Sequence, residues 1–211
     1  MIRTVLGDIS PDSLGNTQCH EHLFIAKGKS FDINPVLYLD DLDKTTSELK
    51  LYCTAGGNSI VDAQPVHCGR MAGALVTASE NTGVNIIAVT GFHKTMFYEN
   101  NGYPFNESED TLTELFESEV TLGMLDIDGT RLRARAGVIK AAVDSGGIHQ
   151  DRIYEMLFSS VANAVSMTRA PVLVHMEKGA AALEIVQYFS DRGIPPYRII
   201  LCHLKTTSHR F

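Results

Sequence analysis

Six short strand-like runs alternate with longer helical patterns along the chain, and this alternation restricts the fold more than any other feature of the sequence. The clearest run, Asn85–Gly91, is rich in β-branched residues and apolar on both faces, as a strand inside a parallel sheet is. The expected strands are 17–22, 58–63, 85–91, 135–142, 170–176 and 197–204, and the expected helices are 41–55, 71–83, 109–122, 149–169 and 180–193. Such a series predicts a parallel sheet with right-handed crossovers.

Both a doubly wound sheet and a (β/α)8 barrel fit this alternation. A dinucleotide-binding sheet would carry a glycine-rich turn after the first strand, but His20 and His22 stand where that turn would begin. In a barrel, chemistry gathers at the carboxyl ends of the strands. Ligand-type residues stand at four expected strand ends, namely His20, His22, Lys140, His175 and His203. We therefore predict an α/β fold of the (β/α)8 TIM-barrel type, here an incomplete barrel of six βα units, in a single domain of residues 1–211.

The spacing of the histidines at the first strand end indicates a metal site. Residues i and i+2 of a strand share a face, so we expect His20 and His22 side by side and Glu21 turned away. Neutral imidazole is a common zinc ligand. The alternatives are two solvated histidines on a surface strand, and core histidines satisfied by a neighbour at His175 and His203.

Lys140 is an unusual residue for its surroundings, because it follows the apolar stretch AGVI. A bare ammonium would be costly to bury there. A lysine that reaches solvent at the strand end is one interpretation. Otherwise the amine has a low pKa or is chemically changed, and reaction with carbon dioxide would turn it into a carbamate whose two oxygens can bridge two cations.

The composition excludes several classes of function. The net charge is −7 and no basic cluster is present, so a nucleic-acid partner is not expected. No apolar stretch approaches the roughly 20 residues that span a bilayer, so no membrane association is expected either. The first ten residues, MIRTVLGDIS, lack the apolar core of a signal peptide, which predicts a cytoplasmic location. Four widely spaced cysteines without a CxxC pair indicate free thiols.

Five stretches resemble strand signatures of the phosphotriesterase family of the amidohydrolase superfamily: GNTQCHEHLF, NIIAVTGFH, AGVIKAA, VLVHMEKG and IILCHL. By this resemblance, His20 and His22 would hold one divalent metal ion, and His175 and His203 would hold a second. A carboxylated Lys140 would bridge the two ions. Zinc is the expected metal, with manganese, cobalt or iron as alternatives.

The resemblance also implies an activity. A hydroxide held between the two metals would attack a small-molecule ester, lactone or phosphoester, while one metal polarises its C=O or P=O bond. His93, at the end of the third expected strand, would face the same mouth and contact the substrate. A homodimer is expected by the same resemblance.

The sequence departs from the family pattern at its end. The family carries a strand-eight aspartate that binds one metal and accepts the proton of the hydroxide, and no residue here corresponds to it, so no catalytic residue is assigned. Lys205 stands where the family has aspartate in a His-x-Asp pattern. A fragment, a truncated gene product or a degenerate copy would explain this, and the alternative function is a non-catalytic or inactive truncated barrel that at most binds metal.

Arg70 leaves two interpretations open at the sequence level. It lies in HCGR, after the second expected strand. Its guanidinium could meet an anionic group of a substrate, or it could pair with a carboxylate of the protein, and the second interpretation is favoured. No role is assigned to His67, His149 or His209.

Overall fold

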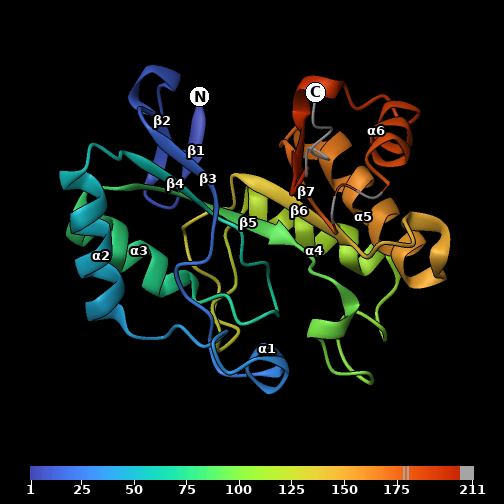
Figure 1. The fold of residues 1–211 in the computed structure, drawn as a ribbon. Coiled ribbons are helices and arrows are strands. Elements are labelled where there is room, and N and C mark those ends of the chain that lie inside the picture. The colour runs from blue at the N-terminus through green and yellow to red at the C-terminus, as the bar shows by residue number, and fades with distance from the viewer. Residues whose placement is uncertain (178, 180, 205–211) are drawn as a thin grey trace, which may run out of the picture.

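The computed structural model describes residues 1–177, 179 and 181–204, and its centre is a parallel sheet of six strands (Figure 1). The strands follow one another in chain order across the sheet, each bonded in parallel to the next. They are β3 (Thr17–Glu21), β4 (Ser59–Asp62), β5 (Asn85–Gly91), β6 (Val138–Val143), β7 (Val172–Met176) and β8 (Ile199–Cys202). The sheet is an incomplete (β/α) barrel, as predicted.

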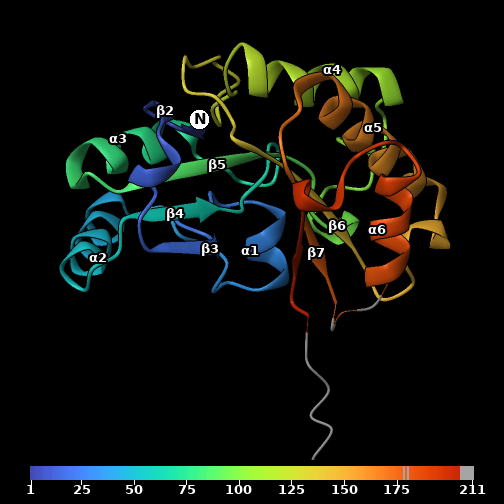
Figure 2. The same cartoon turned by 90° about the horizontal axis from the view of Figure 1, so that it is seen from above.

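Helices connect the strands, and the larger ones are amphipathic. They are α1 (Lys29–Ile33), α2 (Leu42–Thr54), α3 (Ala72–Thr82), α4 (Glu109–Thr121), α5 (Arg152–Thr168) and α6 (Ala182–Ser190). Short 3-10 turns span Pro11–Ser13, Thr95–Phe97, Ile148–Gln150 and Pro196–Arg198. Figure 2 shows α2 and α3 beside β3 to β5, and α4 to α6 beside the later strands. No helix in the described part of the chain has the length and apolar character needed to cross a membrane.

Local sequence signals set the helix ends. The side chain of Asp41 accepts a hydrogen bond from the backbone N–H of Lys44 and begins α2. Ser108 caps α4 in the same way, through the N–H of Thr111. These side chains satisfy N–H groups that have no partner inside the helix. Gly83 ends α3 in the left-handed conformation (φ 74°), which glycine adopts without steric cost.

The five expected helices and six expected strands are all present, and Asn85–Gly91 has the bounds predicted for it. Two features were not predicted. One is the short helix α1, and the other is an antiparallel hairpin of β1 (Ile2–Thr4) and β2 (Gly7–Ile9). The backbone N–H of Val5, in the hairpin turn, donates to the carbonyl of Ile86 and so ties the hairpin to β5.

The two faces of the sheet carry different side chains, and this difference positions the candidate site. The large hydrophobic core lies between the sheet and its helices. A smaller cluster contains Val138 and Leu173, from the alternate positions of β6 and β7. Lys140 and His175 follow these two residues by two positions, so they extend the same face toward the carboxyl ends of the strands.

Within the described residues the sheet is open, because β3 and β8 lie at its two edges and are not bonded to each other. The carboxyl ends of the two edge strands nevertheless approach each other without closure of the sheet. The rings of His20, on the first edge strand, and His203, just beyond the last, have centroids 5.0 Å apart, so the bend of the open sheet is sufficient.

Candidate metal centre

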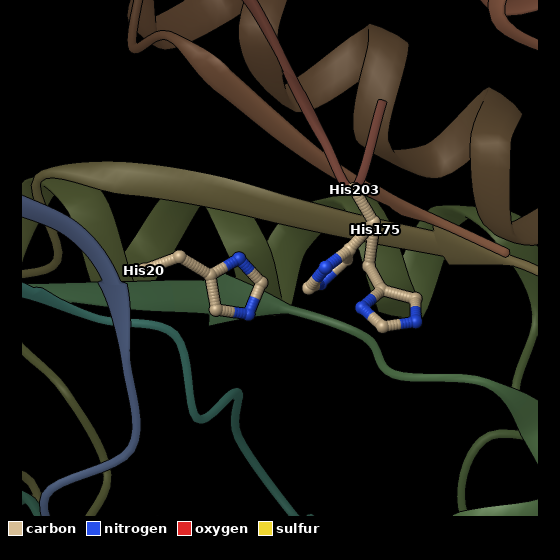
Figure 3. Close-up of side chains that lie close together, drawn as sticks. All are labelled: His20, His175 and His203. Atoms are coloured by element: carbon tan, nitrogen blue, oxygen red, sulfur yellow. The ribbon is translucent and has the colours of Figure 1, made fainter. Parts of the chain in front are cut away.

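Three histidines from both edges and the interior of the sheet meet at the carboxyl ends of the strands. His20 lies in β3, His175 in β7, and His203 directly follows β8. Each offers a ring nitrogen, and these nitrogens all lie within 4.8 Å of one another. The ring centroids of His175 and His203 are 4.5 Å apart, and those of His20 and His175 are 6.1 Å apart. Figure 3 shows the ring of His20 facing the other two. Such a group can bind one metal ion.

Two ring nitrogens of this group are buried without a partner. The Nδ1 atoms of His20 and His175 make no hydrogen bond within the described part of the chain. A buried polar atom without a partner costs free energy, and a native site that tolerates one calls for an explanation such as an ion. The donor set therefore fits a metal ion.

Burial keeps the imidazoles of His20, His22 and His175 neutral. Burial, and after it the charge of Lys140, lower the pKa of His20 to about 4. The same two causes, in the same order, lower the pKa of His22 to about 3 and that of His175 to about 3. Neutral imidazole is the form that binds metals, so these rings are ready for a cation at neutral pH.

His22 lies beside the three-histidine group and is not a member of it. The residue directly follows β3, and its ring centroid is 5.5 Å from that of His20, as expected for side-by-side histidines. Its Nδ1 lies 2.6 Å from Oε1 of Gln64. The family resemblance pairs His20 with His22, whereas His20 lies closer to His203. Glu21 points elsewhere, because its carboxylate accepts a hydrogen bond from the side chain of Gln18.

Lys140 is fully buried, with 0 % of its surface exposed. It lies within β6 and not at its end, because β6 continues alongside β7 as far as Val143. Its Nζ donates to the carbonyl oxygen of Ala63 at 2.6 Å. Burial lowers the pKa of this amine to about 8. A low pKa was one of the two outcomes expected for a lysine that stays in apolar surroundings.

His93 contacts the same group of rings. Its ring centroid is 5.3 Å from that of His175 and 6.4 Å from that of His22. Only 9 % of the residue is exposed. Its Nδ1 accepts a hydrogen bond from the backbone N–H of Lys94 at 2.7 Å, so the other ring nitrogen carries the proton of the neutral ring.

Sequence reasoning missed the segment of residues 62–64, at the end of β4. The carboxylate of Asp62 accepts a hydrogen bond from the backbone N–H of Leu23 at 2.8 Å. Ala63 accepts from Lys140, and Gln64 contacts His22. Two residues of this segment thus hydrogen-bond to predicted ligands, Lys140 and His22. The polar Gln64 after an apolar strand was the available signal.

Arg70 pairs with a carboxylate, so the favoured interpretation is confirmed. Its two terminal nitrogens donate to the two carboxylate oxygens of Glu119 at 2.8 and 2.6 Å, and also to the carbonyls of Val89 and Leu125. Both side chains are buried. The sequence position of Lys205 lies outside the described residues, as does that of His209.

The sequence matches the model of the phosphotriesterase family over residues 1–210. A phospho-furanose lactonase of Mycoplasmopsis agalactiae is 31% identical, with 100% of this chain and 61% of that protein aligned. The chain thus spans about 61% of the length of this curated relative.

Solved structures agree with the sequence match. The crystal structure of an amidohydrolase from Mycoplasma synoviae superposes with a TM-score of 0.88 at 30% identity, over 96% of this chain and 60% of that one. A lactonase from Listeria monocytogenes gives a TM-score of 0.83 at 29% identity, over 96% of this chain and 64% of that one. The family model, the relatives and the fold all agree, and the chain therefore belongs to the phosphotriesterase family.

Proposed function

We propose that the chain contributes the metal centre of a hydrolase that acts on an ester, lactone or phosphoester. One observation carries this proposal: three histidine side chains from separate strands, next to a fully buried lysine, meet at the carboxyl ends of a parallel sheet. In barrels, that end of the strands is where catalysis takes place. The family match and the lactonase relatives support the reaction class.

Two divalent ions would be held by the residues named from the sequence, which are His20, His22, Lys140, His175 and His203. Zinc fits nitrogen and oxygen donors best, and manganese, cobalt or iron are alternatives. When bound, the ions would lower the pKa of a water molecule and polarise the C=O or P=O bond of the substrate.

Lys140 would act as an oxygen donor after reaction with carbon dioxide. The neutral amine forms the new N–C bond and releases one proton, which leaves an anionic carbamate. The lowered pKa of Lys140 supports this step, because it raises the fraction of neutral amine at neutral pH. The hydrogen bond to Ala63 is the contact that the amine must give up.

His93 would orient the substrate. Its Nδ1 is occupied by the backbone N–H of Lys94, so its other nitrogen is a hydrogen-bond donor. A donor beside the ligand rings could bind the carbonyl or phosphoryl oxygen of a substrate. The name of the Mycoplasmopsis agalactiae relative makes a lactone of a phosphorylated furanose sugar the first substrate to test.

The alternative, a barrel that binds metal without catalysis, has less support. The relatives are hydrolases, and all five ligand-type residues are present in this sequence. Because the chain spans about 61% of the length of that relative, the activity of the whole protein is part of the proposal.

The test is hydrolysis by the zinc- or manganese-loaded protein of three substrates: a phosphorylated furanose lactone, a simple aryl ester and a phosphotriester. We expect lactone turnover that a chelator abolishes and added metal restores. His175→Ala should abolish it, whereas His149→Ala should not, because His149 is exposed and pairs with Glu155. Turnover that persists in chelator would contradict the proposal. Tight metal binding without turnover on any substrate would favour the non-catalytic alternative.

A further inference from the structure

We propose that Gln64 is a positioning residue that sets the tautomer of His22. Its side chain would keep the proton on Nδ1 of His22 and leave Nε2 as the only ring nitrogen able to bind a cation. The tautomer itself follows from hydrogen bonding alone. Only the consequence for metal affinity rests on the proposed function.

The orientation of the Gln64 amide is fixed by its second partner. The amide nitrogen of Gln64 donates to the carbonyl oxygen of Cys68. A backbone carbonyl can only accept, so the NH2 group must face Cys68 and the amide oxygen must face the other way. The side chain is buried, with 2 % of the residue exposed, so water does not compete for either bond.

The orientation of the amide then determines the state of His22. The Nδ1 atom of His22 lies 2.6 Å from Oε1 of Gln64, and that oxygen has no hydrogen to give. The ring must therefore be the donor. A neutral imidazole has a single N–H, so Nε2 carries the lone pair.

His93 provides a contrast within the same group of rings. Its Nδ1 accepts from the backbone N–H of Lys94, which places its proton on Nε2. Two neighbouring histidines, with centroids 6.4 Å apart, are thus expected in opposite tautomers. By comparison, the buried Nδ1 atoms of His20 and His175 have no partner in the described part of the chain.

Such a hydrogen bond matters for metal binding. A ligand histidine that donates its other N–H is held in one orientation and becomes more basic, and removal of the acceptor lowers metal affinity about 10–100-fold in characterised sites. If His22 is a ligand, Gln64 should have an effect of that size although it touches no metal itself.

The first experiment reads the tautomers in the metal-free, ¹⁵N-labelled protein, with spectra that correlate ring nitrogens and ring protons. We expect His22 with its proton on Nδ1 and His93 with its proton on Nε2. Gln64→Leu removes the acceptor and should release His22 into a mixture of tautomers. Gln64→Glu keeps an acceptor for His22 and loses the donor to Cys68, so His22 should stay protonated on Nδ1.

The second experiment measures zinc affinity by competition with a chromophoric chelator. Gln64→Leu should bind one of the ions about 10–100-fold more weakly, whereas Gln64→Glu should remain within a few-fold of the natural protein. Gln18→Leu is the matched control, because the side chain of Gln18 is exposed on β3 and donates a hydrogen bond to Glu21. Urea unfolding of each metal-free variant separates lost affinity from lost folding.

The outcomes separate the two claims. Protonation of His22 on Nε2 in the natural protein would overturn the inference. Unchanged zinc affinity in Gln64→Leu would overturn its consequence for metal binding. A natural protein with the predicted tautomers but no zinc binding would contradict the proposed metal centre, and the role of Gln64 in setting the tautomer would stand.

Discussion

The interior strands and the edge strands of the sheet contribute to the candidate site in different ways. Lys140 and His175 come from β6 and β7, which pair with neighbours on both sides. His20 lies in one edge strand and His203 directly follows the other, and in the described part of the chain each of these strands has a neighbour on one side only. Side chains in the interior are therefore positioned by packing and by continuous strand pairing. Those at the edges depend on a few specific contacts.

The local geometry shows this difference. The pairing of β3 with β4 is irregular between Gln18 and Glu21, whereas β6 pairs with β7 without interruption over five residues. His203 is exposed and has a left-handed backbone (φ 61°), which is rare for a residue other than glycine. The interior half of the site thus lies on regularly paired strands, whereas the edge half combines irregular pairing with a residue in an unfavourable backbone conformation. Unfavourable backbone conformations tend to gather at functional sites.

The largest effect is expected at the interior half of the site. Lys140→Ala should remove most of the bound metal, because it deletes the predicted bridging group. Metal content after dialysis, measured by elemental mass spectrometry, checks this. Added bicarbonate should not restore metal, but a small carboxylate that fills the space should do so in part. Lys50→Ala, on the exposed face of α2, is the control. Unchanged metal content in Lys140→Ala would mean that Lys140 is only a buried amine.

The next effect concerns the stability of the interior. Arg70→Leu should lower the free energy of unfolding by about 3–5 kcal/mol, because it leaves the buried Glu119 carboxylate without its cation. The double variant Arg70→Leu/Glu119→Leu should recover a large part of that loss. Urea denaturation followed by circular dichroism measures both. Equal losses in the single and double variants would show that packing, and not the unpaired charge, sets the cost.

Acid should affect His175 of the site and the buried Arg70–Glu119 pair in different pH ranges. Burial lowers the pKa of His175 to about 3, while the unfolded residue titrates near 6.5. Below about pH 6.5 the unfolded chain therefore binds protons that the folded site does not, and this lowers the stability of the folded protein as the pH falls from about 6.5 toward 3. Glu119 behaves differently: burial opposes its charge, but Arg70 and the hydrogen bond from the N–H of Leu125 together outweigh burial and hold the pKa below the usual 4.5.

The stabilisation from Glu119 is therefore present above pH 4.5 and is lost below it. Urea unfolding of the metal-free protein between pH 3 and pH 8 tests the two ranges, with pH steps of about one unit. His175→Gln should flatten the stability curve most clearly between about pH 4.5 and 6.5, above the range in which Glu119 contributes. A curve of the same shape in the variant would contradict the assignment.

The sequence predicted the regular part of this molecule because regular elements leave periodic patterns. The run Asn85–Gly91 could be recognised from its β-branched, fully apolar residues, and the ligand-type residues from their places near strand ends. The hairpin of β1 and β2 was missed because strands of three residues are too short to show alternation. The contact of Gln64 with His22 joins residues 42 apart in sequence, and no local pattern records such a contact.

The smallest effect is expected at the edge. His203→Ala and His203→Gly should lose metal equally, because both remove the ring. The glycine variant should nevertheless be more stable than the alanine variant by about 1 kcal/mol, because glycine accepts a left-handed backbone without steric cost. Thermal unfolding of the two metal-free variants measures the difference. Equal stabilities would indicate that the backbone beyond β8 relaxes freely. The edge would then carry no backbone strain, and the contrast between edge and interior would not hold.

The most direct test of the metal centre is anomalous diffraction from crystals of the zinc-loaded protein, recorded at the zinc absorption edge. We expect two zinc peaks among His20, His22, His175 and His203, with extra density for a carbamate on Nζ of Lys140. The interior ligands should keep the positions described here, and the edge ligands should move toward the ions. Zinc peaks elsewhere, with these four rings unliganded and Lys140 still bonded to Ala63, would contradict the claim that interior and edge strands together form a metal centre.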